Sequence, residues 1–99
     1  MSEIIKQGDR IIVKPGRDIV ASTAEDLKAE LKQALDEGAA NLTIDLSDVE
    51  MVDSMGLGVL IAAHNSLRKK ESSLTLINPS VDILKLLKNM RLDQHFLIL

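Results

Sequence analysis

The sequence predicts an α/β domain with a mixed β-sheet, parallel where helices cross between strands and antiparallel between the first two strands. Two short apolar segments near the start flank a two-residue turn, which indicates a hairpin. Apolar alternation and helical periodicity then follow one another with short connections. With 99 residues and 45% hydrophobic residues, the chain is expected to form one domain, residues 1–99, around a single core of two or three layers.

The hairpin comes first. Strands are predicted over residues 4–7 and 10–14, and they flank Gly8-Asp9 as a two-residue turn. Pro15-Gly16 ends the second strand, because proline and glycine interrupt regular pairing.

An amphipathic helix follows the loop after the hairpin. A capping box can open it in two ways, Ser22 with Glu25 or Thr23 with Asp26. Gly38 comes just past its end as a C-cap. Its apolar stripe consists of Ala24, Leu27, Leu31, Ala34 and Leu35. The charged opposite face indicates a scaffold helix that covers one face of the sheet.

The third strand, predicted over Asn41–Leu46, leads toward the most informative segment of the chain. A helix is predicted over Met55–Leu67, so that Ser54 falls at the N-cap position. The first N–H groups of a helix lack helical partners, and together with the helix dipole they favour negative charge. The fold should therefore tolerate a phosphate on Ser54. The plainer interpretation, an ordinary helix cap, is the commoner one.

Gly56 and Gly58 lie in the first turns of this helix, where each costs about 1 kcal/mol relative to alanine. Either they allow tight internal packing, or they let another backbone, a nucleotide or a protein partner approach closely. The helix also has almost no polar face in its first two turns. This pattern predicts a helix that is buried on both sides or that offers part of its surface to a partner.

The last elements are a strand over residues 73–78 and a helix over Val81–Met90, with Pro79-Ser80 as stop and new cap. The packing face of this helix consists of Ile83, Leu84, Leu87 and Met90. The tail, Phe96–Leu99, is apolar to its last residue, and we expect it to dock as a short strand or to cap the core.

Composition argues against several classes of function. Without cysteine there are neither disulfides nor thiolate metal sites. The net charge is −3, and the one basic run, Arg68-Lys69-Lys70, is typical of a solvated helix end. Phe96 is the only aromatic residue, so the chain has no stacking surface for bases. Nucleic-acid binding is therefore not expected. No apolar run is long enough to span a bilayer, and the N-terminus lacks the features of a signal peptide. We expect a cytoplasmic protein without membrane insertion.

Catalytic and metal-binding patterns are also missing. A nucleophile elbow would need glycine in place of Val52, and Gly56-x-Gly58 lacks the rest of a dinucleotide fingerprint or a P-loop. His64 and His95 have no partner at ligand spacing. Three acids near the end of the third strand could hold a magnesium ion or accept a phosphoryl group: Asp45, Asp48 and Asp53. Acids in such turns usually form local hydrogen bonds, so we expect them to hold no metal and to accept no phosphoryl group, and we expect no cofactor.

The segment Leu46–Leu60, with Asp-Ser-x-Gly-Leu-Gly at residues 53–58, resembles the signature of the STAS domain, and specifically that of bacterial anti-sigma factor antagonists. The resemblance covers nearly the whole chain and implies a mixed sheet of four or five strands with helices mainly on one side. It implies that Ser54 is phosphorylated by a partner that is both anti-sigma factor and serine kinase. The unphosphorylated form would bind that partner and free a sigma factor, and a PP2C-type phosphatase would reset the switch. A phosphate beside Asp53 should weaken the complex by repulsion and desolvation rather than by unfolding the domain.

The resemblance assigns partner binding to the loop before the first helix and to the motif. These residues are Asp18, Ser22, Asp53, Ser54, Met55, Gly56, Leu57 and Gly58. Two features depart from the family pattern: the acid at Asp18 comes one position early, and Met55 replaces a small polar residue, which makes the surface beside Ser54 more apolar.

The resemblance thus predicts a binding module, a monomer or weak dimer, and not an enzyme. A constitutive STAS interaction subunit of a signalling or transporter-associated complex, with Ser54 never modified, is the alternative function. A small enzyme or nucleotide sensor that uses the acidic residues ranks last.

Overall fold

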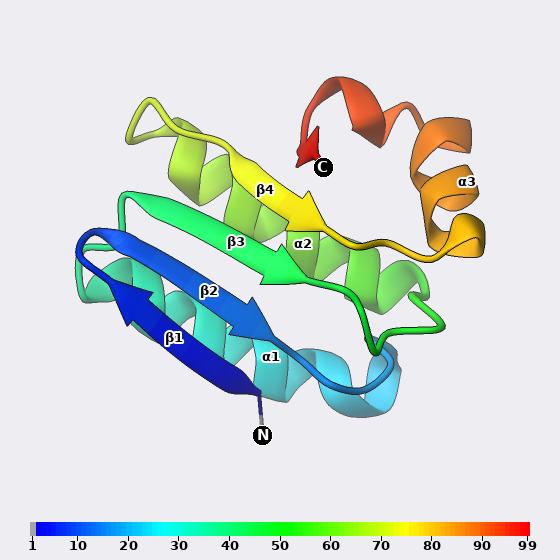
Figure 1. Ribbon diagram of the computed structural model, residues 1–99, viewed down its shortest axis with the longest axis horizontal. Coiled ribbons are helices and arrows are strands. Elements are labelled where there is room, and N and C mark those ends of the chain that lie inside the picture. Colours follow the sequence, from blue (N-terminus) through cyan, green and yellow to red (C-terminus); the bar gives the residue numbers. More distant parts are fainter. Residues whose placement is uncertain (1) are drawn as a thin grey trace.

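The computed structural model describes residues 2–99 and contains a five-stranded sheet in the order β1-β2-β3-β4-β5 (Figure 1). The strands are β1 (Glu3–Gln7), β2 (Arg10–Lys14), β3 (Asn41–Asp45), β4 (Leu74–Ile77) and β5 (Leu97–Ile98). Only the β1–β2 pair is antiparallel, since the other three pairs are parallel. The predicted α/β class and mixed sheet are therefore confirmed, as is the turn at Gly8-Asp9, which joins Gln7 to Arg10.

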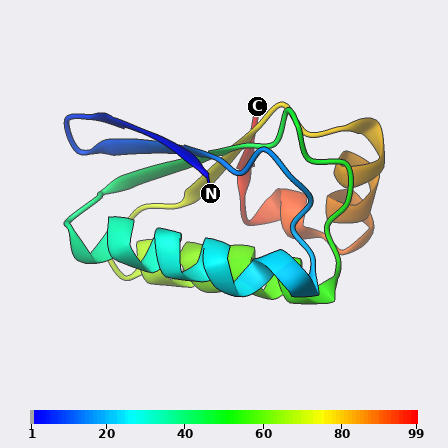
Figure 2. The same ribbon diagram turned by 90° about the horizontal axis from the view of Figure 1, so that it is seen from below.

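The helices lie on one face of this sheet. They are α1 (Ala21–Asp36), α2 (Ser54–Arg68), α3 (Val81–Asn89) and the short 3-10 helix η1 (Leu92–Gln94). Figure 2 shows α1 and α2 side by side beneath the strands, and none of the helices formed by residues 2–99 lies on the opposite face. The strand residues that face the helices are buried: Ile11, Val13, Leu42, Ile44, Leu74 and Leu76. Period-two alternation in the sequence thus separates the core face from the open face of the sheet.

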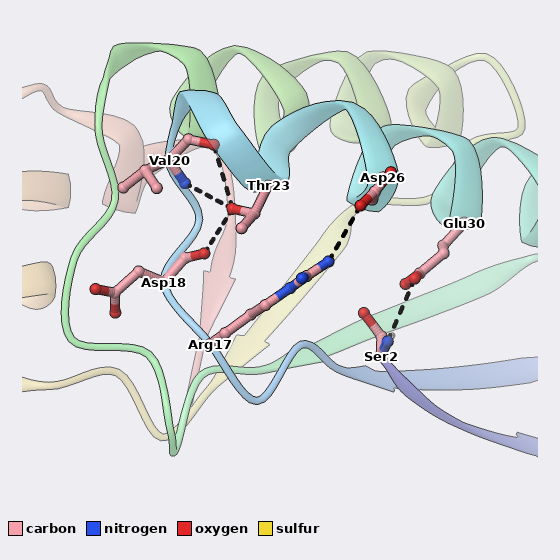
Figure 3. A network of polar contacts seen from close by, with 7 residues as sticks. All are labelled: Ser2, Arg17, Asp18, Val20, Thr23, Asp26 and Glu30. Carbon is pink, nitrogen blue, oxygen red and sulfur yellow. Dashed lines mark hydrogen bonds and ion pairs between the residues drawn. The ribbon is translucent and has the colours of Figure 1, made fainter.

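Helix α1 begins two residues before the Ser22 box, and three before the Thr23 box, would allow. Val20 is the N-cap in an extended conformation, and the Thr23 hydroxyl accepts from the Val20 N–H at 3.0 Å and donates to the Asp18 carbonyl at 2.7 Å (Figure 3). The boxes Ser22 with Glu25 and Thr23 with Asp26 are therefore wrong. Asp26 instead forms an exposed ion pair with Arg17 at 3.4 Å.

The rest of α1 follows the prediction. Its stripe is buried at Ala24, Leu27, Leu31 and Ala34 and half-buried at Leu35. Gly38, with φ +95°, follows the C-cap residue in the left-handed region that favours glycine.

Helix α3 and the tail close the far side of the core. Ser80 caps α3 as predicted, because its hydroxyl accepts from the Ile83 N–H at 3.1 Å. Ile83 and Leu87 are buried, but Met90 is 50% exposed, so its assignment to the packing face is wrong. Met90 lies beyond the last helical residue, and Arg91 turns the chain away with φ 58°. The tail docks as β5 next to β4, as expected.

His64 of α2 is buried beneath this tail. Its Nδ1 accepts from the Leu74 N–H at 3.3 Å, and its ring meets that of Phe96 edge-on with centroids 5.2 Å apart. Burial, assisted by the nearby Arg68 and His95, lowers the pKa of His64. The ring is therefore neutral in the folded protein at neutral pH.

Candidate functional site

The site lies at the edge of the sheet where the parallel strands end and α1 and α2 begin. There the loop after β2 runs beside the loop after β3, and Ile19 forms a parallel bridge with Val52. The Ile19 N–H donates to the Met51 carbonyl at 3.0 Å, and the Asp53 N–H donates to the Ile19 carbonyl at 3.2 Å. These bonds join the two loops into one unit immediately before Ser54.

Asp18 strengthens the same junction. Its Oδ1 accepts from the backbone N–H of Glu50 at 2.9 Å and of Met51 at 3.1 Å. Its carbonyl also accepts the Thr23 hydroxyl at the start of α1. Asp18 therefore joins the loop after β2, the loop after β3 and the start of α1. These contacts within the chain explain why an acid stands at position 18.

Asp53 caps two helices at once. Its Oδ1 accepts from the Gly56 N–H of α2 at 2.9 Å, and its Oδ2 accepts from the Ala21 N–H of α1, also at 2.9 Å. The hydrogen bond from the Gly56 N–H holds the pKa of the Asp53 carboxyl below its usual range. Partial desolvation raises this pKa, whereas the N–H groups of Ala21 and Met55 lower it further. One carboxylate thus accepts hydrogen bonds from two adjacent helix starts, whose positive ends favour its negative charge.

The predicted N-cap at Ser54 is therefore wrong, because Asp53 occupies that position and Ser54 is the first residue of α2. An aspartate offers two acceptor oxygens, and the bridge at Ile19 brings the start of α1 within reach of the second one. Ser54 is exposed, and within residues 2–99 its hydroxyl forms no side-chain hydrogen bond. Its hydroxyl is accordingly available for chemistry at the positive end of a helix.

The two glycines of the motif have different environments. Gly56 is buried, and a Cβ there would overlap the carbonyl oxygen of Ile19. Gly58 is exposed, and apart from its chain neighbours and the adjoining backbone of α2, no heavy atom of residues 2–99 lies within 4 Å of the position of its missing Cβ. Close approach at Gly56 thus comes from this chain's own backbone, whereas Gly58 leaves open space beside α2.

The remaining predicted site residues divide by exposure. Ser22 and Met55 are exposed, and Met55 has 52% of its surface accessible. Leu57 is 6% exposed and belongs to the core, so it offers no surface to a partner. Met51, 58% exposed, was not predicted. The only indication in the sequence is a methionine three residues before Ser54. The fold is needed to show that this side chain lies at the surface beside the motif.

The three acids considered for a metal have separate roles. Asp45 accepts from the Ser47 N–H at 3.0 Å and from the Asn78 amide at 3.2 Å, whereas Asp48 pairs with Lys14 at 3.3 Å. The local hydrogen bonds expected of Asp48 in its turn are not among those formed by residues 2–99; Asp45, expected only as the polar face of its strand, accepts the local bond instead, and Asp53 is engaged at the helix ends. Among the described residues, no group of three or more potential ligands could hold a metal ion. Within that range, no helix is long and apolar enough to cross a membrane.

Fold and site together define an α/β module with an exposed serine at the start of a helix, flanked by exposed methionines. The sequence model of the STAS domain matches residues 2–99. An anti-sigma-B factor antagonist from Listeria monocytogenes is 36% identical over 78 residues, which are 79% of this chain and 68% of that relative. The chain therefore belongs to the STAS domain family, among the anti-sigma factor antagonists.

Solved structures agree on the fold. A crystal structure from Thermotoga maritima superposes with a TM-score of 0.93 at 24% identity, covering 98% of this chain and 84% of that one. The anti-sigma factor antagonist SpoIIAA in its unphosphorylated form superposes with a TM-score of 0.80 at 15% identity, covering 100% of this chain and 87% of SpoIIAA. The phosphorylated form of SpoIIAA, from Bacillus, gives a TM-score of 0.79 at 16% identity over 100% of this chain and 91% of that one.

Proposed function

We propose that this protein is an anti-sigma factor antagonist switched by phosphorylation of Ser54. Unphosphorylated, it binds a partner that is both anti-sigma factor and serine kinase, and so releases a sigma factor in the cytoplasm. Phosphorylation by that partner ends the interaction, and a PP2C-type phosphatase restores it. The protein is a substrate and binding module in this scheme and not an enzyme. One observation carries the proposal: the exposed Ser54 hydroxyl directly follows a carboxylate that already caps two helices.

The electrostatics of the site support a switch that leaves the fold intact. A phosphate adds about −1.5 to −2 charges at neutral pH, and the N-terminus of α2 favours negative charge. The two hydrogen bonds of Asp53 do not involve the Ser54 hydroxyl, so its phosphorylation should leave both helix starts in place. The added charge lies beside an ionised Asp53, and a partner that approaches this surface must desolvate both groups. Binding should weaken while the domain stays folded.

The surface around Ser54 suits a protein partner. Met51 and Met55 are both more than half exposed, and methionine adapts its shape to apolar contacts. Gly58 lets a partner backbone approach α2 one turn after Ser54, and exposed Ser22 lies at the adjoining start of α1. SpoIIAA, which shares the fold, has been solved in unphosphorylated and phosphorylated forms, and the Listeria relative is an anti-sigma-B factor antagonist. These likenesses support the same type of partner here.

The proposal is tested with the cognate anti-sigma factor kinase, ATP and three variants. Ser54→Ala should bind the kinase as the wild type does and accept no phosphate, whereas Ser54→Asp should bind poorly. Ser47→Ala is the control, an exposed serine of the turn after β3, and it should still bind the kinase and accept phosphate at Ser54. Site mapping by mass spectrometry and calorimetry of the complexes measure these outcomes. Phosphate elsewhere or nowhere, with equal binding of both Ser54 variants, would favour a constitutive interaction subunit.

A further inference from the structure

A second surface lies along the helices, away from Ser54. It is a groove of about 320 Å³ between α1 and α2. Its apolar lining consists of Leu31, Leu35, Val59, Ala62 and Ala63, and its polar lining of Lys28, Lys32, Asp36, Ser66 and Lys70. Figure 2 shows these two helices on the side of the molecule opposite the open face of the sheet. We call this surface the α1–α2 groove.

The groove is long enough to hold about two turns of a helix. Its α1 lining extends from Lys28 to Asp36, which is about 12 Å at 1.5 Å per residue, or about two helical turns. On α2, the exposed lining residues Ala62 and Ser66 are four positions apart and lie on one face. Because these side chains are small, a helical segment can approach both α1 and α2 at once.

The charge of the groove differs from that of the whole chain. The protein has a net charge of −3, but the groove contains three lysines and one aspartate. Lys70 is held at the C-terminal end of α1, where its ammonium donates to the carbonyl of Leu35 at 3.0 Å. The ion pairs formed within residues 2–99 involve neither Lys28 nor Lys32. These two exposed ammonium groups border an apolar floor and remain available to acidic side chains.

We propose that the α1–α2 groove docks an amphipathic helix of a partner protein, with aliphatic residues toward the floor and glutamate or aspartate toward Lys28 and Lys32. This surface goes beyond the Ser54 switch. The groove lining on α2 extends from Val59 to Ser66, five to twelve residues from Ser54, which is about 8–18 Å along the helix, or about one to two times the distance over which salt screens charge. The charge on Ser54 should therefore affect binding in the groove less than charge reversal at Lys28 and Lys32 does.

The test uses a designed helical peptide with leucine on one face and glutamate beside it, and the same peptide with lysine in place of glutamate. Titration followed by amide NMR should show saturable shifts at Leu31, Ala62 and Ser66 with the acidic peptide only. The double variant Lys28→Glu/Lys32→Glu should weaken that binding about tenfold and bind the basic peptide instead. The matched control is Lys85→Glu/Lys88→Glu, two exposed lysines of α3, which should bind the acidic peptide unchanged.

Several outcomes would overturn the proposal: equal binding of both peptides, no effect of charge reversal, shifts outside the groove, or perturbation by oleate but not by peptide. Groove shifts that depend on protein concentration without peptide would assign the surface to a second copy of the chain and would likewise contradict it. Ser54→Asp should weaken binding of the acidic peptide less than Lys28→Glu/Lys32→Glu does. The groove and the Ser54 switch can therefore fail independently.

Discussion

The two glycines of the motif should respond in opposite directions to the same substitution. In Gly56→Ala, the new methyl group meets the Ile19 carbonyl, which must move and lose its bond from the Asp53 N–H. Overpacking costs about 1–3 kcal/mol and the lost hydrogen bond about 1 kcal/mol, while the higher helix propensity of alanine returns about 1 kcal/mol. The variant should be less stable than the wild type by about 1–3 kcal/mol.

In Gly58→Ala, the methyl group enters open space. Only the propensity gain remains, and the variant should be more stable than the wild type by about 1 kcal/mol. For a domain of this size, 1 kcal/mol corresponds to a Tm shift of about 4–8 °C.

Thermal and urea unfolding of the two variants measure both changes. A Gly56→Ala protein as stable as the wild type would refute the close contact with Ile19. A Gly58→Ala protein that is destabilised would refute the open space beside α2. If Gly58 serves partner approach as proposed, Gly58→Ala should also bind the anti-sigma factor kinase more weakly despite its higher stability, which separates a binding role from a folding role.

Three further predictions concern caps and titration. Ser80→Ala should lower the free energy of unfolding in urea by about 1 kcal/mol, because the Ser80 hydroxyl caps α3. Asp53→Ala should lower it further, because the Asp53 carboxylate caps both α1 and α2. The pKa of Asp53 is lowered in the folded state, so its ionised carboxylate stabilises the fold above the unfolded-state pKa, and this stabilisation disappears as the pH falls through the folded-state pKa. Below about pH 4, Asp53→Ala should therefore lose stability less steeply than the wild type. The pKa of His64 is also lowered, and protonation would remove its acceptor for the Leu74 N–H, so wild-type stability should fall as pH drops below about 6.5. Unfolding at several pH values should show this fall in the wild type and in His95→Gln but not in His64→Gln; a fall that persists in His64→Gln would contradict the assignment.

The elements that could be predicted are those whose signals are local. Alternation at Leu42 and Ile44 marks β3, the apolar stripe marks α1, and a serine after proline marks the start of α3. Met90 shows where local periodicity misleads, because the chain leaves the helix before that residue can pack.

The details of the site depend on contacts between segments far apart in the sequence. Asp53 and Ser54 are adjacent and both suit an N-cap, and the choice between them is explained by the Ile19–Val52 bridge, which brings the Ala21 N–H to the second oxygen of Asp53. The same bridge places the Ile19 carbonyl against Gly56. No spacing pattern could distinguish this internal contact from the approach of a partner, although Ser54 itself was correctly identified as an accessible hydroxyl at a helix start.

The most direct test of the switch compares the dissociation constant of the anti-sigma factor kinase for the unphosphorylated protein and for the protein phosphorylated at Ser54, at one salt concentration. Amide NMR of both forms should show that the fold is unchanged. We predict that phosphorylation weakens binding at least about tenfold, because the phosphate and Asp53 together oppose burial of this surface. Equal dissociation constants for the two folded forms would contradict the proposed function.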